Sequence, residues 1–307
     1  MSIGVVLSGD GATTVDSMLR AADVALYQAK QDGRNTMRLF HPDMQARVDV
    51  RSALEGRLRK GFADELLHVC YQAQVDADGR LMSAEALMRW NERDGSSVPP
   101  GDFIQVAEES GFIHTLGGWS LRTACEQMVK WRGRLPEGFR VAVNLSAPEF
   151  TRPDFPQRVL NMLAQTGAHG SELRLEITER TVVQDLRATV ERMRLLMKHG
   201  IEFSLDDFGS GNSSLTFLQK LPVHEVKIDQ SYVRRILHHP SDAAIVRAIL
   251  AMCNALDLRV VAEGVETHEQ WTRLLDDGCR HFQGFLFGRP QMSTPDPMTL
   301  VAARKVV

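Results

Sequence analysis

The stretch SLDDFGSGNSSL, residues 204–215, places two adjacent carboxylates, Asp206 and Asp207, between a short apolar run and a loop rich in glycine and serine. The apolar run predicts a buried strand, so the two carboxylates stand at its carboxyl end. Two like charges about 4 Å apart repel by roughly 4 kcal/mol where solvent screens them only partly. We therefore expect a group of opposite charge to hold them together.

Strand-like runs of the same kind alternate with longer helical patterns from about residue 67 onward. Several of the runs are apolar almost throughout, as expected of strands covered on both faces. The eight runs are residues 66–75, 80–90, 140–146, 172–178, 202–208, 225–229, 258–265 and 281–287. Eight strands, mostly followed by helices, predict an α/β fold closed into a (β/α)8 barrel. A doubly wound open sheet is the alternative, which periodicity alone leaves open.

The composition is that of a soluble protein with a large core. The 307 residues include 36 basic and 39 acidic side chains, which lacks the basic excess of a dedicated nucleic-acid binder. The four cysteines are far apart and form no CxxC pair, so we expect reduced thiols in a cytoplasmic protein. The most apolar helical segment, residues 243–256, is interrupted by Arg247 and is too short to span a bilayer. The chain could still be the cytosolic part of a longer, membrane-anchored protein.

Residues 1–43 differ from the rest of the chain. One strand-like piece, SIGVVL, precedes one amphipathic helix, VDSMLRAADVALYQAKQDG, which ends at Gly33. A charged helical stretch follows, and we assign residues 44–65 to a linker and lead-in helix. The barrel domain is then expected to occupy residues 66–300.

Most of the strand-like runs carry a polar, mostly acidic residue at or near the carboxyl end. These residues are Glu85, Asn144, Glu176, Asp206 with Asp207, Lys227 with Asp229, Glu263, and Gln283. In an α/β barrel such strand ends meet at one rim, where the catalytic groups of this fold lie. Strand parity also places Arg174 and Glu176 on one face, pointing into the barrel mouth.

Each of these residues alone has an ordinary explanation, because a single strand glutamate is usually solvated and a Lys-x-Asp pair is usually a surface ion pair. Together, five carboxylates on one rim would raise one another's pKa unless cations separated them. Oxygen ligands of this kind suit Mg²⁺ or Mn²⁺ better than zinc. Two such ions sharing Asp206 would explain the adjacent carboxylates, and two-ion sites typically serve hydrolysis at a phosphoryl centre.

These segments resemble the EAL domain family. The tripeptide Glu85-Ala86-Leu87 within SAEALMRW, and then VNLS, LEITE, DDFGSGNSSL, VKID, VAEGVET and FQGFLFGRP, have the family's order and spacing over residues 50–295. The resemblance implies a modified barrel whose first strand is antiparallel to the others. It also implies hydrolysis of cyclic di-GMP to linear pGpG with two Mg²⁺ or Mn²⁺ ions, and a homodimer through the barrel.

The resemblance further implies a role for each matching residue. The implied metal ligands are Glu85, Asn144, Glu176 and Asp206 for one ion, and Asp206, Asp207 and Glu263 for the other. Glu263 would also act as a base, Lys227 would orient the attacking water or a phosphate oxygen, and Asp229 would support Lys227. Glu179 resembles the residue that anchors the loop after Asp207. The implied substrate contacts are Gln72, Arg89 and Gln283, with Glu266 supporting them from further out.

The chain departs from the family pattern at a few positions. Ala73 stands where a proline is usual, and Ser210 and Asn212 replace a common threonine and tyrosine in the loop. None of these changes removes a metal ligand, which favours an active phosphodiesterase over a catalytically silent cyclic-di-GMP receptor. The segment before residue 44 resembles the end of a GGDEF domain, but no GGDEF signature occurs in the chain.

Overall fold

The structure, a computed structural model, describes residues 1–7, 14–33, 35–179, 181, 185–209, 218–292 and 296–301. Ser210 and Asn212, two of the departures from the family pattern, lie outside the described residues. The chain forms two compact units, one of Met1–Leu66 with Gly101–Ser110 and one of Leu67–Pro100 with Gly111–Val307.

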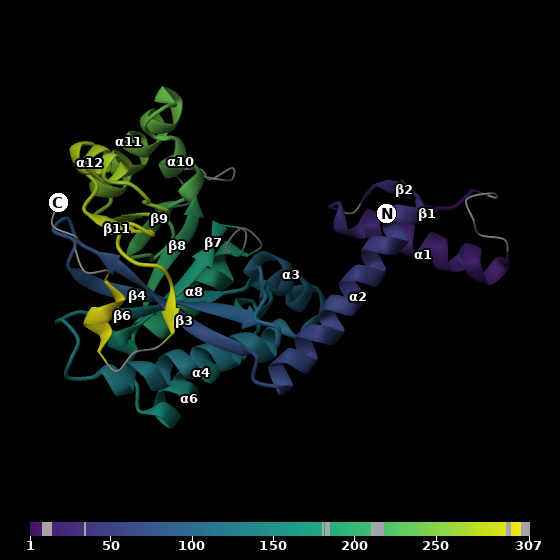
Figure 1. Ribbon diagram of the computed structural model, residues 1–307, viewed down its shortest axis with the longest axis horizontal. Helices are drawn as coiled ribbons and strands as arrows, with labels where there is room; N and C mark the ends of the chain where they lie inside the picture. The colour runs from purple at the N-terminus through teal and green to yellow at the C-terminus, as the bar shows by residue number, and fades with distance from the viewer. Residues whose placement is uncertain are drawn as a thin grey trace. The chain divides into compact units, whose positions relative to one another are not determined.

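The first unit combines a small parallel sheet with helices. Strand β1 (Ile3–Val5) pairs with β2 (Met37–Leu39), and helix α1 (Val15–Gln31) connects them (Figure 1). Helix α1 begins at Thr14, whose side chain accepts from the backbone of Ser17 in a capping box, and it ends two residues before the predicted Gly33. The three-residue strand β2 was not predicted, because so short a run has no periodicity to detect.

Helices α2 (Pro42–Ala63) and α3 (Pro100–Ser110) complete this unit. Glu109 of α3 accepts a hydrogen bond from Tyr27 of α1 at 3.3 Å and forms an ion pair with Arg51 of α2. These contacts explain why residues 101–110 group with the N-terminal segment, although the sequence placed them inside the barrel domain.

The second unit is a closed barrel, as predicted. Its eight strands are β3 (Leu67–Val75), β4 (Leu81–Asn91), β6 (Arg140–Leu145), β7 (Leu173–Thr178), β8 (Glu202–Phe208), β9 (Glu225–Ile228), β10 (Arg259–Ala262) and β11 (His281–Gln283). They follow one another around the sheet as β3-β11-β10-β9-β8-β7-β6-β4, and the pairing of β4 with β3 closes the ring. Strand β3 is antiparallel to both of its neighbours, which confirms the expected reversed first strand.

Short strands and helices surround this ring. Strand β5 (Ser97–Val98) pairs with β4, and β12 (Gln291–Met292) pairs with β3. The helices labelled around the strands in Figure 1 are α4 (Ile113–Trp131), α6 (Phe155–Thr166), α8 (Leu186–Met197), α10 (Gln230–Arg235), α11 (Pro240–Ala255) and α12 (His268–Asp276). The unit also contains the short helix α5 (Ala147–Phe150) and the 3-10 turns η1 (Gly170–Glu172) and η2 (Pro297–Leu300). In the part of the chain that the structure describes, no helix is both long and apolar enough to cross a membrane.

Strand parity divides the side chains between two environments. Leu175, Phe203 and Val226 are fully buried and belong to the apolar core, whereas their strand neighbours Glu176, Ser204 and Lys227 are buried and polar. Because alternate residues of a strand point to opposite faces, the polar set lines the barrel interior. The interior therefore carries the chemistry, and the apolar layer outside it carries the packing.

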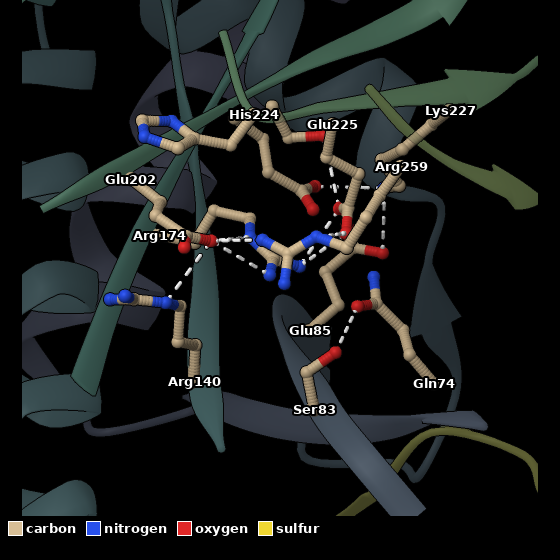
Figure 2. Close-up of polar contacts among 12 residues, drawn as sticks. Gln74, Ser83, Glu85, Arg140, Arg174, Glu202, His224, Glu225, Lys227 and Arg259 are labelled. Atoms are coloured by element: carbon tan, nitrogen blue, oxygen red, sulfur yellow. Dashed lines mark hydrogen bonds and ion pairs between the residues drawn. The ribbon is translucent and has the colours of Figure 1, made fainter. Parts of the chain in front are cut away.

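The amino-terminal end of the barrel is closed by ion pairs. Arg174 lies between two carboxylates, with Nη1 2.7 Å from Glu225 and Nη2 3.1 Å from Glu202 (Figure 2). Glu202 also pairs with Arg140 and Arg259 from the neighbouring strands. Arg174 thus points into the barrel as parity required, but it serves this end and not the mouth where the sequence placed it. The carboxylates that the sequence predicts as metal ligands lie nearer the carboxyl-terminal end of the barrel.

Candidate functional site

The centre of the site is the ammonium group of Lys227, on β9, which is only 1% exposed. Its Nζ lies 3.1 Å from Glu85, 2.8 Å from Glu176, 3.4 Å from Asp206 and 2.7 Å from Glu263. The four carboxylates come from β4, β7, β8 and the residue after β10, so barrel closure alone brings them together. All four are residues that the sequence singled out as metal ligands.

Asn144 and Asp207 extend this cluster. The Asn144 amide Nδ2 donates to Glu85 Oε1 at 2.6 Å. Asp206, Asp207 and Glu263 each offer an oxygen, and these three oxygens lie within 4.8 Å of one another. Together these contacts and the contacts of Lys227 gather every residue of the expected ligand set.

The backbone at Asp207 answers the question that the adjacent carboxylates raised. In a regular strand Asp206 and Asp207 would point to opposite faces of the sheet. Asp207 instead has a φ of 54°, in the left-handed region that residues other than glycine rarely adopt, and its N–H donates to Asp206 Oδ1 at 2.9 Å. This local turn lets two consecutive carboxylates share one site, at the cost of some backbone strain.

Charge crowding shifts the pKa values of the cluster. Burial, together with the charge of Glu85, raises the pKa of Glu176 well above its usual range, and burial likewise raises the pKa of Glu263 and Asp206. Burial and the neighbouring Asp206 raise the pKa of Asp207 to about 6. Burial and like charge therefore both oppose ionisation of these carboxyls, and a cation bound among them would favour it.

The pKa values of Glu85 and Lys227, in contrast, are shifted so that the charged form of each group is favoured. Burial opposes ionisation of Glu85, but Lys227 and the amides of Gln283 and Asn144 outweigh it and lower the pKa of Glu85. Burial alone would lower the pKa of Lys227, yet the surrounding carboxylates raise it well above the usual value. The lysine is therefore a permanent cation among acids that it only partly neutralises.

The donor set fits a pair of hard divalent cations. Oε1 of Glu176 is buried without a hydrogen-bond partner among the described residues, an arrangement that costs free energy unless a ligand uses that oxygen. With all five carboxylates ionised, Lys227 leaves four negative charges, which two divalent ions would balance. Carboxylate and amide oxygens are the ligands that Mg²⁺, Mn²⁺ and Ca²⁺ take in proteins.

A cavity of about 620 Å³ lies beside the cluster and has Glu85 and Glu263 in its wall. The residues proposed from the sequence as substrate contacts, with the supporting Glu266, all line it: Gln72, Arg89, Gln283 and Glu266. Gln283 links the cavity to the cluster, because its Nε2 donates to Glu85 Oε2 at 2.6 Å and to Gln72 Oε1 at 3.2 Å. A ligand in this cavity would contact the carboxylate cluster directly.

The sequence reasoning missed other residues of this cavity, and those with large side chains beyond the strand ends are Gln230, Arg234, Phe285 and Arg289. The Arg289 guanidinium stands 4.2 Å from the centre of the Phe285 ring, which is 45% exposed and faces the cavity. These residues follow the strand ends instead of standing on them, so a search restricted to strand ends does not find them.

Asp229 has a different partner from the one that the sequence suggested. Asp229 was expected to support Lys227, but β9 ends at Ile228 and Asp229 becomes the N-cap of α10, accepting from the Ser231 N–H at 2.8 Å. The Asp229 carboxyl also raises the pKa of Asp207 through a hydrogen bond. The Asp229 side chain therefore affects Asp207, the second of the two adjacent carboxylates.

Glu179 holds the chain just after that pair. Its Oε1 accepts from the Gly209 N–H at 3.3 Å, while Tyr232, which the sequence reasoning missed, donates its hydroxyl to the Gly209 carbonyl at 2.5 Å. Gly209 is thus held on both sides of its backbone. Residues 210–217, the loop that follows, lie outside the described residues.

The structure is thus an α/β barrel with a cluster of carboxylates at the carboxyl ends of its strands. The cluster is suited to bind divalent cations, and the cavity beside it is lined by arginines. The chain belongs to the EAL domain family, which it matches over residues 55–290.

Among curated proteins, the chain is 40% identical over 291 residues to the bifunctional diguanylate cyclase/cyclic di-GMP phosphodiesterase MucR of Pseudomonas aeruginosa, covering 94% of this chain and 42% of MucR. The chain spans less than half the length of the curated relatives it matches.

Solved structures of other proteins are also similar to this chain. The PaMucR phosphodiesterase in complex with c-di-GMP is similar with a TM-score of 0.76 and 39% identity, over 78% of this chain and 98% of that one. The calcium/c-di-GMP complex of BlrP1 from Klebsiella pneumoniae is similar with a TM-score of 0.63 and 30% identity, over 74% of this chain and 56% of that one.

Proposed function

We propose that the barrel is a metal-dependent phosphodiesterase that hydrolyses one phosphodiester bond of cyclic di-GMP and releases linear pGpG. The observation that carries the proposal is the set of carboxylates around Lys227, with Glu176 Oε1 left unpaired, in the wall of a cavity that also presents Arg89. The similarity to two solved structures that hold c-di-GMP, one of them the PaMucR phosphodiesterase, supports the choice of substrate.

The proposed ions are two Mg²⁺ or Mn²⁺, and the residues that would hold them are Glu85, Asn144, Glu176, Asp206, Asp207 and Glu263. When bound, such ions activate water and neutralise charge on the phosphate oxygens. The BlrP1 structure is a complex with calcium as well as c-di-GMP, which supports a hard divalent cation that prefers oxygen ligands.

The chain's own residues supply the remaining functions. Glu263, whose pKa burial raises, is suited to accept the proton of the attacking water. Arg89 would bind a phosphate oxygen of the substrate, since a guanidinium matches phosphate geometry well. The water oxygen bonds to phosphorus as Glu263 takes its proton, the bond from phosphorus to the 3′ oxygen breaks, and the 3′ oxygen takes up a proton from Glu263 or from solvent.

The experiment is to incubate the protein with cyclic di-GMP and Mg²⁺ or Mn²⁺, with and without a chelator, and to identify the product by chromatography. Glu85→Gln and Asp206→Asn are each expected to lower turnover by about a hundredfold or more. Glu191→Gln, on an exposed face of α8, is the matched control and is expected to retain turnover. Full turnover by either site variant would refute the assignment, and tight binding without pGpG would favour the silent receptor.

Other parts of the proposal concern the molecule around the site. A homodimer that forms through the barrel is proposed from the family resemblance, and light scattering with activity measured on the same fractions tests it.

Residues 1–43 are proposed to be the end of a GGDEF domain. The match to MucR supports this proposal because it extends before residue 55. The four free, buried cysteines support a reducing, cytoplasmic location.

A further inference from the structure

The lysine at the centre of the site has an unusual set of contacts. A buried lysine ordinarily pairs with one carboxylate, whereas Lys227 reaches four, at 2.7 to 3.4 Å. An ammonium group has only three protons to donate, so the four acids compete for it. Three of its partners, Glu85, Glu176 and Asp206, are also the residues proposed to hold one of the metal ions.

The other donors of the site complete the same pattern. Both oxygens of Glu85 are already occupied, Oε1 by the Asn144 amide at 2.6 Å and Oε2 by Gln283 at 2.6 Å and Lys227 at 3.1 Å. Only Oε1 of Glu176 is left buried and unpaired among the described oxygens of these residues. N–H groups of Lys227, Asn144 and Gln283 thus use the same Glu85 oxygens that a metal ion would need as ligands.

We propose that Lys227 is a resident counter-cation that competes with divalent ions for Glu85, Glu176 and Asp206, and so determines how tightly the barrel binds metal. The inference deepens the proposed function, because it rests on the proposed metal site. It assigns Lys227 a positioning role toward the ions, distinct from contact with water or phosphate.

The direction of the effect follows from charge. Without the ammonium, the metal-free protein keeps buried acids with no cation among them, and it should be less stable. A divalent ion entering the same site no longer meets a positive charge or displaces one, so it should bind more tightly.

The test uses the full chain with Lys227→Met, which keeps the length of the side chain and removes its charge. After chelator treatment and desalting, Mn²⁺ is titrated by calorimetry at pH 8.5, where protons compete least with the ion. We expect Lys227→Met to bind Mn²⁺ about tenfold more tightly than the wild type. Lys220→Met, at an exposed position, is the matched control and is expected to bind Mn²⁺ as the wild type does.

Thermal unfolding separates this role from ordinary packing. Lys227→Met should melt about 5 °C or more below the wild type in chelator, and the gap should close with saturating Mn²⁺. Should Lys227→Met not fold without metal, Lys227→Met with Glu176→Gln removes one of the crowded acids and should melt above the single variant. Lys227→Arg keeps the charge and should retain the weaker, wild-type Mn²⁺ affinity.

Equal or weaker Mn²⁺ binding by Lys227→Met would overturn the proposal, and so would a loss of melting temperature that is the same with and without Mn²⁺. If the wild type itself bound no Mn²⁺, the metal site of the proposed function would fall as well. If the wild type bound Mn²⁺ and released pGpG while Lys227→Met bound Mn²⁺ unchanged, only the competition would be rejected.

Discussion

Replacing Arg174 by methionine should destabilise the barrel from the end opposite the carboxylate cluster. Arg174 is 3% exposed and forms ion pairs with Glu225 at 2.7 Å and Glu202 at 3.1 Å (Figure 2). Methionine has a similar length without the charge, so the substitution removes the pairs and largely keeps the packing. The cost should come from the carboxylates left behind.

The two carboxylates are affected unequally. Glu202 keeps Arg140 and Arg259 as partners, so it remains neutralised. Glu225, which is 4% exposed, keeps only Arg259 at 3.7 Å and the Ser204 hydroxyl at 3.2 Å as described partners. Breaking a buried ion pair costs about 3–5 kcal/mol, and the partners that remain favour the lower end, about 3 kcal/mol.

The assay is thermal unfolding followed by circular dichroism, with chelator present so that metal binding does not contribute. A barrel of this size loses about 2–4 °C per kcal/mol, so Arg174→Met should melt about 6–12 °C below the wild type. The matched control is Arg187→Met, whose pair with Glu191 is 91% and 66% exposed. Such a pair contributes about 0.5 kcal/mol or less, and the control should melt within about 2 °C of the wild type.

A double variant decides whether the uncompensated charge is the cause. Arg174→Met with Glu225→Gln replaces the stranded carboxylate by a neutral amide, so it should melt above Arg174→Met alone. The reasoning is refuted if Arg174→Met melts within about 2 °C of the wild type, or if the double variant is no more stable than the single one.

Three other predictions concern the site and its supports. Because the pKa values of Glu176, Asp206, Asp207 and Glu263 are raised in the folded, metal-free protein, these groups bind more protons folded than unfolded, and their contribution to stability falls as pH rises through about 6. The melting temperature should therefore fall more between pH 4.5 and pH 6.5 in chelator than in saturating Mn²⁺, and equal slopes would contradict the prediction. Tyr232→Phe removes one of the two hydrogen bonds at Gly209 and should lower turnover without changing Mn²⁺ affinity, whereas a changed Mn²⁺ affinity would show that Gly209 positions the ligands themselves. Gly284→Ala should unfold or inactivate the barrel, because the added carbon would lie 2.0 Å from the Val265 carbonyl, while Gly101→Ala meets nothing within 4 Å and should be neutral when both variants are compared by melting temperature.

The sequence predicted the strands well because most of them are buried on both faces. The predicted run 140–146 is β6 at Arg140–Leu145, and the run 202–208 is β8 at the same residues. The face of such a strand that packs under the helices is apolar, as Leu175, Phe203 and Val226 are, and this alternation with polar residues marks the strand in the sequence. The site residues at strand ends could be found in the same way, since closure of the barrel brings those ends together.

What the sequence did not predict depends on contacts between distant segments. The turn at Asp207 needs a φ of 54° that no local pattern near a strand end favours. Arg174 was placed at the mouth because parity gives the face of a side chain but not its depth along the barrel. Asp229 was placed with Lys227 because the end of β9 at Ile228 leaves no mark in a continuous VKID sequence.

The barrel interior is therefore organised as two charged layers on the same strands. Arg174 and Glu176 stand two residues apart on the inward face of β7, so one strand contributes to both layers. The layer at the amino end has three arginines against two glutamates, whereas the layer at the carboxyl end has five carboxylates against one lysine. The first layer nearly balances itself and can serve stability alone. The second layer does not balance itself with its own side chains, and the proposed divalent cations would supply the positive charge that it lacks.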